Sequence, residues 1–150
     1  MGASGWDYRA PYAGSVDATL IAVRERALAS GDYLWPWEEF DAGETVPRPT
    51  TLAELDEAME AEEFWDVGTH SILDVRGVAT EDSFSAIRPL SARELDQVFG
   101  TRQPSAADFE RVQQAGALAA LEGESWSGRS VVIHRNGSPE EVYFWGHSGD

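Results

Sequence analysis

Apolar residues recur at helical spacing in the first part of the chain. Leu20 and Val23 follow Ser15, whose hydroxyl suits a helix N-cap, and Gly31 stands where such a helix would end. This pattern predicts a helix over residues 16–30.

Three further helices are indicated by their N-terminal residues. Thr51 with Glu54, and Ser91 with Glu94, have the S/T-x-x-E spacing of a capping box. We expect these two helices to end near Trp65 and Gly100. Another helix is predicted to begin at Pro104 and Ser105, with Phe109 and Val112 on its buried side.

Alternation of apolar and polar residues predicts four strands, at residues 71–78, 84–90, 130–135 and 141–146. A polar turn joins the first two, and Asn136 with Gly137, a strong hairpin signal, joins the last two. The order ααββααββ predicts an α+β domain with an antiparallel sheet of about four strands in two hairpins, covered on one side by helices. Residues 1–14 precede the first element, and we expect them to form a poorly ordered arm.

Composition narrows the function classes. The chain has 150 residues, of which 42% are hydrophobic, which suits a single domain over residues 1–150. Its net charge of −16 argues against direct binding to nucleic acid or to an anionic membrane. The absence of cysteine excludes disulfides, thiolate metal sites and cysteine nucleophiles. No leader or membrane-spanning run is recognisable, so we expect a cytoplasmic protein without a cofactor.

The stretch from Asp32 to Asp66 combines acidity with large aromatic residues. It holds twelve acidic residues, one arginine (Arg48) and three of the six tryptophans. Rings supply buried area and carboxylates supply charge pairing, so we interpret the stretch as a surface that binds a basic protein. The predicted contact residues are Trp35, Trp37, Glu38, Glu39, Phe40, Asp41, Glu44, Glu57 and Glu60. The alternative is a solvated acidic face whose tryptophans turn inward to complete the core.

Small size, acidity, an aromatic loop and the lack of a catalytic motif together resemble the general style of bacterial immunity proteins and antitoxins, which block a basic toxin surface. That resemblance implies an inhibitor that acts by occlusion, with a basic protein, such as a toxin, as partner. A related alternative is a nucleic-acid mimic, which would require carboxylates spaced in regular rows like phosphates.

A small enzyme or ligand-binding protein is the rival class, because histidine suits proton transfer near neutral pH. In a strand beginning near Ser71, His70 and Asp74 would lie on one face and share a polar site. The other interpretation is a histidine at a strand entrance that hydrogen-bonds to a loop.

The last predicted hairpin offers a second histidine site. Depending on register, His134 shares a face with Tyr143, Trp145 and His147, which would form an aromatic wall for a planar ligand. Packing of these side chains beneath a helix is the alternative. Nothing in the spacing indicates that His70 joins the other two histidines, so we expect no metal site.

Overall fold

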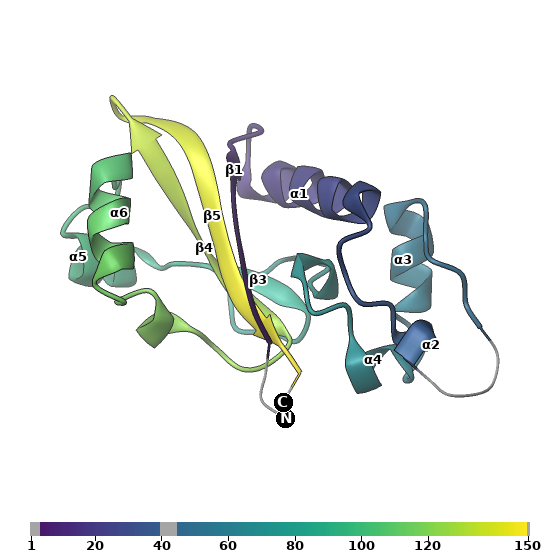
Figure 1. The fold of residues 1–150 in the computed structure, drawn as a ribbon. Coiled ribbons are helices and arrows are strands. Elements are labelled where there is room, and N and C mark those ends of the chain that lie inside the picture. The colour runs from purple at the N-terminus through teal and green to yellow at the C-terminus, as the bar shows by residue number, and fades with distance from the viewer. Residues whose placement is uncertain (1–3, 40–44, 150) are drawn as a thin grey trace.

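The computed structural model describes residues 4–39 and 45–149, and it has an α+β fold built on one mixed, five-stranded sheet (Figure 1). The strands are β1 (Ser4–Pro11), β2 (Gly77–Val78), β3 (Ala86–Pro89), β4 (Ser127–Arg135) and β5 (Ser138–Ser148). The helices are α1 (Val16–Ser30), α2 (Pro36–Glu39), α3 (Leu52–Ala58), α4 (Phe64–Val67), α5 (Ala92–Phe99) and α6 (Ala106–Gln114), with short 3₁₀ turns η1 (Ile72–Asp74) and η2 (Ala119–Leu121). The strand order across the sheet is β1-β5-β4-β3-β2.

The C-terminal hairpin is confirmed. Strands β4 and β5 pair antiparallel, and the turn between them contains Asn136 and Gly137 at φ values of 51° and 78°. Two successive positive φ values are the signature of a type I′ turn, which matches the twist of the flanking strands.

The first predicted hairpin is wrong. Within residues 71–78, Ile72–Asp74 form the turn η1, only Gly77–Val78 is a strand, and β2 pairs with β3 in parallel. Strand β3 in turn runs parallel to β4. Local hydrogen bonding explains the difference, since the Ser71 hydroxyl accepts from the backbone N–H of Leu73 at 3.1 Å and holds the chain in a turn.

The N-terminal residues 4–11, predicted as part of a poorly ordered arm, are instead the edge strand β1. It pairs antiparallel with β5 over its whole length, from Ser4 opposite Ser148 to Pro11 opposite Glu141. Within the strand, Trp6 and Ala10 are buried between exposed neighbours, which is the alternation of a half-buried strand.

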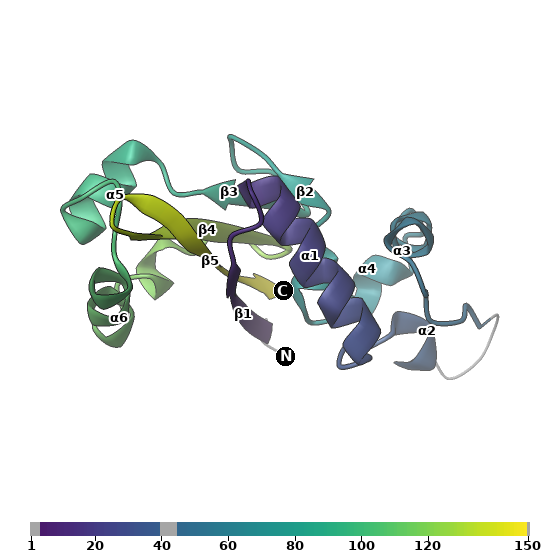
Figure 2. The same ribbon diagram turned by 90° about the horizontal axis from the view of Figure 1, so that it is seen from above.

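Helices cover both faces of the sheet, so the prediction of helices on one side only is wrong. Val142 and Phe144 of β5 face a core completed by Val23 of α1. Tyr143 and Trp145, on the opposite face, pack in a second core with Phe109 of α6 and its neighbours. Figures 1 and 2 show α1 and α6 on opposite sides of the sheet.

Helix starts agree well with the sequence. Ser15 caps α1, which spans Val16–Ser30 and ends at Gly31 in the left-handed conformation. The capping box of Ser91 and Glu94 is present in full. The helix that begins after Thr51 is shorter than predicted, because α3 ends at Ala58 and the separate turn α4 follows. Within the described residues, no helix has the length and apolar character needed to cross a membrane.

Candidate functional site

Three aromatic side chains from separate segments form what we call the aromatic ledge: Trp65, Phe84 and Trp126. The centroid of the Trp65 ring lies 4.6 Å from that of Phe84 and 5.2 Å from that of Trp126. Phe84 is 56% exposed, and the two tryptophans are half-buried. The ledge therefore presents aromatic surface to the outside while standing on packed rings.

Backbone and side-chain contacts fix the ledge. Trp65 donates its indole N–H to the carbonyl of Met59 at 2.9 Å. Trp126 has a φ of 67°, its N–H donates to the His147 carbonyl at 2.9 Å, and its carbonyl accepts from the Ser85 N–H at 2.8 Å. A Cβ added at Gly68 would lie 2.3 Å from the Trp126 ring, so glycine at this position lets the indole sit against the backbone.

The segments that supply the ledge are strongly acidic. Residues 62–66, 81–84 and 122–126 contain seven acidic residues and no basic one. Two of the seven take part in ion pairs, Asp82 with arginine and Glu122 with the His147 ring. In the part of the chain that the structure describes, no ion pair involves the other five, which are Glu62, Glu63, Asp66, Glu81 and Glu124. Most of the carboxylates beside the ledge thus have no ion-pair partner among the described residues.

A cavity of about 560 Å³ opens beside Phe84, and we call it the Phe84 cavity. Carboxylates and hydroxyls dominate its lining, which includes Asp82, Phe84, Glu122, Glu124, Ser127 and Arg129. Its size lies within the range of small-ligand sites or of pockets that receive one long side chain from a partner.

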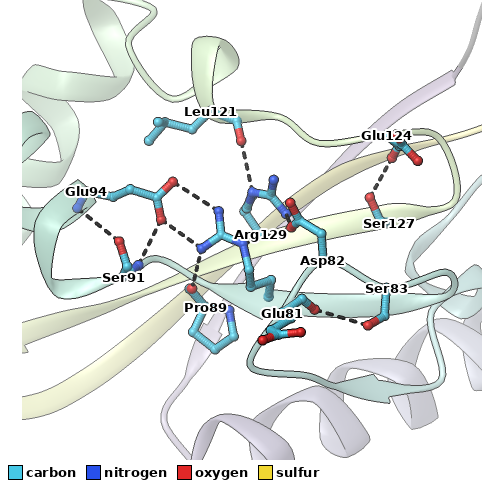
Figure 3. Close-up of polar contacts among 11 residues, drawn as sticks. Glu81, Asp82, Ser83, Pro89, Ser91, Glu94, Leu121, Glu124, Ser127 and Arg129 are labelled. Carbon is cyan, nitrogen blue, oxygen red and sulfur yellow. Dashed lines mark hydrogen bonds and ion pairs between the residues drawn. The ribbon is translucent and has the colours of Figure 1, made fainter.

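Two arginines on the adjacent strands β3 and β4 anchor the loop that carries Phe84, and Figure 3 shows Arg129 beside Asp82 of that loop. Arg129 of β4 is nearly buried, donates from Nε to the Leu121 carbonyl at 2.9 Å and places Nη1 2.6 Å from Oδ1 of Asp82. Arg88 of β3 donates from Nε to the same oxygen at 2.8 Å. Its guanidinium, together with that of Arg129, lowers the pKa of Asp82.

Glu94 completes this network from the first turn of α5. Its two carboxylate oxygens accept from Nη1 and Nη2 of Arg88 at 2.8 and 3.0 Å, and one also accepts from the Ser91 N–H at 2.8 Å. The Arg88 guanidinium holds the pKa of Glu94 at about 2. Ionised Glu94 therefore stabilises the fold at neutral pH.

The ion pair of Glu94 should make the free energy of unfolding sensitive to acid. Because its folded pKa is about 2 and its ordinary value is 4.5, the stabilisation is present above pH 4.5 and is lost as the pH falls toward 2. We expect Glu94→Gln to cost about 3 kcal/mol at pH 7 and much less near pH 2. Urea unfolding at both pH values measures this. The exposed Glu110→Gln is the control, and an equal cost of Glu94→Gln at both pH values would contradict the assignment.

The tryptophans predicted to contact a partner are placed differently from one another. Trp35 is completely buried, and its indole N–H donates to the Val46 carbonyl at 2.7 Å. Trp37 is half-buried, with its ring centroid 5.2 Å from that of Trp35. Trp35 thus belongs to the core formed by α2, α3 and α4, where its ring presents no contact surface.

Among the predicted acidic contacts, Glu38 forms a two-pronged ion pair with Arg48, at 2.8 and 3.0 Å. Glu39, Glu57 and Glu60 are exposed. Phe40, Asp41 and Glu44 lie outside the described residues. Glu39, Glu57 and Glu60 therefore add exposed negative charge to the part of the chain that precedes Trp65 of the ledge.

His70 and Asp74 lie in a turn and not on one face of a strand, and they meet through the backbone N–H of His70. Asp74 is buried, and its carboxylate accepts from the backbone N–H groups of Thr69 and His70 at 2.8 and 3.1 Å. The His70 ring instead has Nδ1 2.7 Å from the Ser4 hydroxyl. Burial raises the pKa of Asp74, and hydrogen bonds from Ser148 and Thr69 oppose that rise. The Asp74 carboxylate thus holds a turn, while the His70 ring makes its hydrogen bond to Ser4.

The predicted aromatic wall is divided between two faces of the sheet. Tyr143 and Trp145 stack with centroids 5.4 Å apart in the core beside α6. His147 lies farther along β5, with Nδ1 3.7 Å from Oε2 of Glu122. His134 lines a separate cavity with Tyr12. Among the described residues, no group of three or more histidine, aspartate or glutamate side chains is arranged to hold a metal ion.

Sequence reasoning recognised Trp65 as part of an acidic aromatic segment but missed Phe84 and Trp126. A signal was present, since all three aromatics follow acidic residues closely, in Glu-Glu-Phe-Trp, Glu-Asp-Ser-Phe and Glu-Gly-Glu-Ser-Trp. Only the fold brings the three segments together.

Comparisons of this chain with protein-family models, with curated proteins and with solved structures find no match.

Proposed function

We propose that this protein is an acidic binding module that docks onto a basic protein surface through the aromatic ledge. The observation that carries the proposal is Phe84, which is 56% exposed and is supported from below by Trp65. An exposed aromatic ring costs free energy in an isolated chain, whereas it can dominate the binding energy at an interface.

The charge around the ledge supports a cationic partner. Five carboxylates of the ledge segments lack an ion pair within the described residues, and lysine or arginine side chains of a partner would relieve their repulsion. Arg76 already lies with its guanidinium carbon 6.0 Å from the centre of the Trp65 ring. This contact illustrates how a cation of a partner would stack on the ledge.

Inhibition by occlusion is the finer form of this proposal. A rigid aromatic surface rimmed by carboxylates suits a protein that covers a basic active surface, as an immunity protein or antitoxin does. Glu39, Glu57 and Glu60 would extend the contact along the acidic α2–α4 region, because they are exposed. The net charge of −16 would accelerate association with a basic partner at low ionic strength.

Replacement of Phe84 provides the test. Wild-type protein is immobilised, its partner is captured from the native cells and purified, and dissociation constants are measured by calorimetry. We expect Phe84→Ala to weaken binding at least about thirtyfold, the effect of losing an interface hot spot of about 2 kcal/mol. Folding should be unaffected, since the ring is largely exposed.

Ile21→Ala is the matched control, because Ile21 is 50% exposed on α1, away from the ledge segments. It should leave the dissociation constant within about twofold of wild type. The association rate should also fall steeply as salt is added. Equal effects of Phe84→Ala and Ile21→Ala, or a salt-independent association rate, would contradict the proposal.

A further inference from the structure

Strand β1 forms one edge of the sheet, and among the described residues no strand pairs with its outer side. It runs for eight residues in continuous register with β5, whereas the strand at the opposite edge, β2, has only two residues. Figure 2 shows β1 at the margin of the sheet, with α1 alongside it. A long, regular edge strand is a template on which a further strand can pair. The outer side of β1 is therefore a candidate interaction surface.

The backbone groups that point outward can be assigned from the register. The Tyr12 N–H donates to the Glu140 carbonyl at 2.9 Å, which continues the pairing of β1 with β5 and assigns the inward-pointing groups to the even-numbered residues. The N–H and C=O groups of Asp7 and Arg9 consequently point away from β5. In the part of the chain that the structure describes, no loop or helix backbone bonds to them. Each of these two residues thus offers a donor and an acceptor to an added strand.

On the α1 side of this edge lies a cavity of about 220 Å³, which we call the α1-side cavity. Its lining includes Tyr8 and Ala10 of β1 and Val23, Arg26 and Ala27 of α1. Arg26 is exposed, and no carboxylate of the described residues lines the cavity. Apolar walls beside an exposed arginine favour an apolar side chain and disfavour a cationic one.

The α6 side of the same edge has the opposite character. A cavity of about 280 Å³, which we call the α6-side cavity, is bounded by the carboxylates of Asp7 and Glu122. Arg9 extends to this side, where it lies between Glu141 and Glu110 at 2.9 and 3.5 Å. Carboxylates therefore outnumber the arginine along this side of β1, and a basic side chain is favoured there.

We propose that β1 accepts an extended segment of a partner protein as a further antiparallel strand, and that this segment alternates apolar and basic residues. Successive side chains of a strand point to opposite faces, so one pattern of period two brings apolar groups to the α1-side cavity and cations to the carboxylates of the α6 side. Backbone bonds to Asp7 and Arg9 provide affinity, and the two sides of the edge provide specificity. The inference does not depend on the aromatic ledge, whose three residues line neither cavity.

A synthetic peptide tests this proposal. The capped peptide Val-Lys-Val-Lys-Val-Lys-Val is titrated into the whole chain, and Val-Val-Val-Val-Lys-Lys-Lys, with the same composition and charge, is the control. Salt at about 0.15 M screens the general attraction of a basic peptide to an acidic chain. We expect the alternating peptide to bind at least about tenfold more tightly than the control, because only alternation serves both sides of the edge.

Amide hydrogen exchange followed by NMR locates the bound peptide. Exchange at Asp7 and Arg9 should slow at least about tenfold at saturation, because their N–H groups gain partners. The amides of Tyr8 and Ala10 are already bonded to β5, so their exchange should change much less. Phe84→Ala should bind the peptide as wild type does, which keeps this result separate from the ledge.

Two substitutions at one position isolate the backbone bond. Arg9→Pro and Arg9→Ala both remove the side chain, but only proline removes the outward N–H. Proline is tolerated at an outward position, as Pro11 of the same strand shows, and equal melting temperatures of the two variants would verify folding. We expect Arg9→Pro to bind the alternating peptide about fivefold more weakly than Arg9→Ala, the usual effect of losing one hydrogen bond.

The charge of the α6 side is tested by Asp7→Asn, which keeps an acceptor oxygen and should weaken binding about threefold. Asp96→Asn, on the exposed side of α5, is the matched control and should have no effect. Equal binding of the two peptides, or unchanged exchange at Asp7 and Arg9 when the peptide is bound, would overturn the proposal. Protection of these two amides that rises with protein concentration in the chain alone would overturn it too, because a second copy would then occupy the edge.

Discussion

Replacing Trp35 by alanine is expected to lower the free energy of unfolding by about 4 to 5 kcal/mol, the range found when a large aromatic side chain is removed from a core. Trp35 is 0% exposed and packs edge-on against Phe64, with ring centroids 6.1 Å apart. The variant also loses the hydrogen bond from the indole to Val46. Chemical denaturation followed by circular dichroism measures the change.

Trp37→Ala is the natural comparison, because Trp37 is adjacent in the same core but half-buried. Its cost should be clearly smaller, about 2 kcal/mol. If Trp35→Ala remained as stable as wild type but failed to bind a partner, Trp35 would belong to an interface and the assignment to the core would be wrong. The pair of variants thus separates the two interpretations that the acidic aromatic sequence leaves open.

Helix starts are predictable here because their determinants are local. A Ser91 hydroxyl and a Glu94 carboxylate three residues later satisfy backbone groups of the same turn, whatever the rest of the chain does. The I′ turn at Asn136 and Gly137 is local in the same sense. Features of this kind were correctly predicted from sequence.

The sheet was predicted only in part, because its errors arise from long-range pairing. Residues 4–11 become strand β1 by pairing with β5, which lies at the other end of the chain. Parallel pairing of β2 with β3 depends on Ser71 and Asp74, whose side chains turn the preceding backbone. The period-2 pattern of residues 71–78 is the same whether the segment is a strand or a turn.

The candidate site likewise combines a local feature that the sequence shows with a long-range arrangement that it does not. Acidic residues beside aromatics are visible in the sequence, but Trp65, Phe84 and Trp126 become one surface only when α4 packs beside the loops that precede β3 and β4. For the histidines, the sequence predicts a shared site that the fold does not form. Strands β4 and β5 place His134 and His147 at opposite ends of their hairpin.

Asp74→Ala should be the second most disruptive change, with a loss of about 4 kcal/mol in the free energy of unfolding. The Asp74 carboxylate accepts from the backbone N–H groups of Thr69 and His70 and from the hydroxyls of Thr69 and Ser148. Hydroxyls can rotate to other acceptors, but the two amides cannot, and each buried donor left without a partner costs about 1 to 3 kcal/mol. Asp66→Ala, an exposed aspartate in α4, is the control and should change stability little.

Asparagine at position 74 separates the role of shape from that of the acceptor oxygens. Asp74→Asn keeps the size of the side chain and one acceptor oxygen, but its NH₂ group replaces the second and faces the N–H of His70 or Thr69. We expect a loss of about 2 kcal/mol in urea unfolding, between wild type and Asp74→Ala. Ser148→Ala removes one donor to the Asp74 carboxylate and also the acceptor of the buried Trp6 indole N–H, at 3.1 Å, so it should cost about 2 kcal/mol as well. If all three variants were as stable as the wild type, the carboxylate would not hold the turn, and the parallel arrangement of β2 and β3 would need another cause.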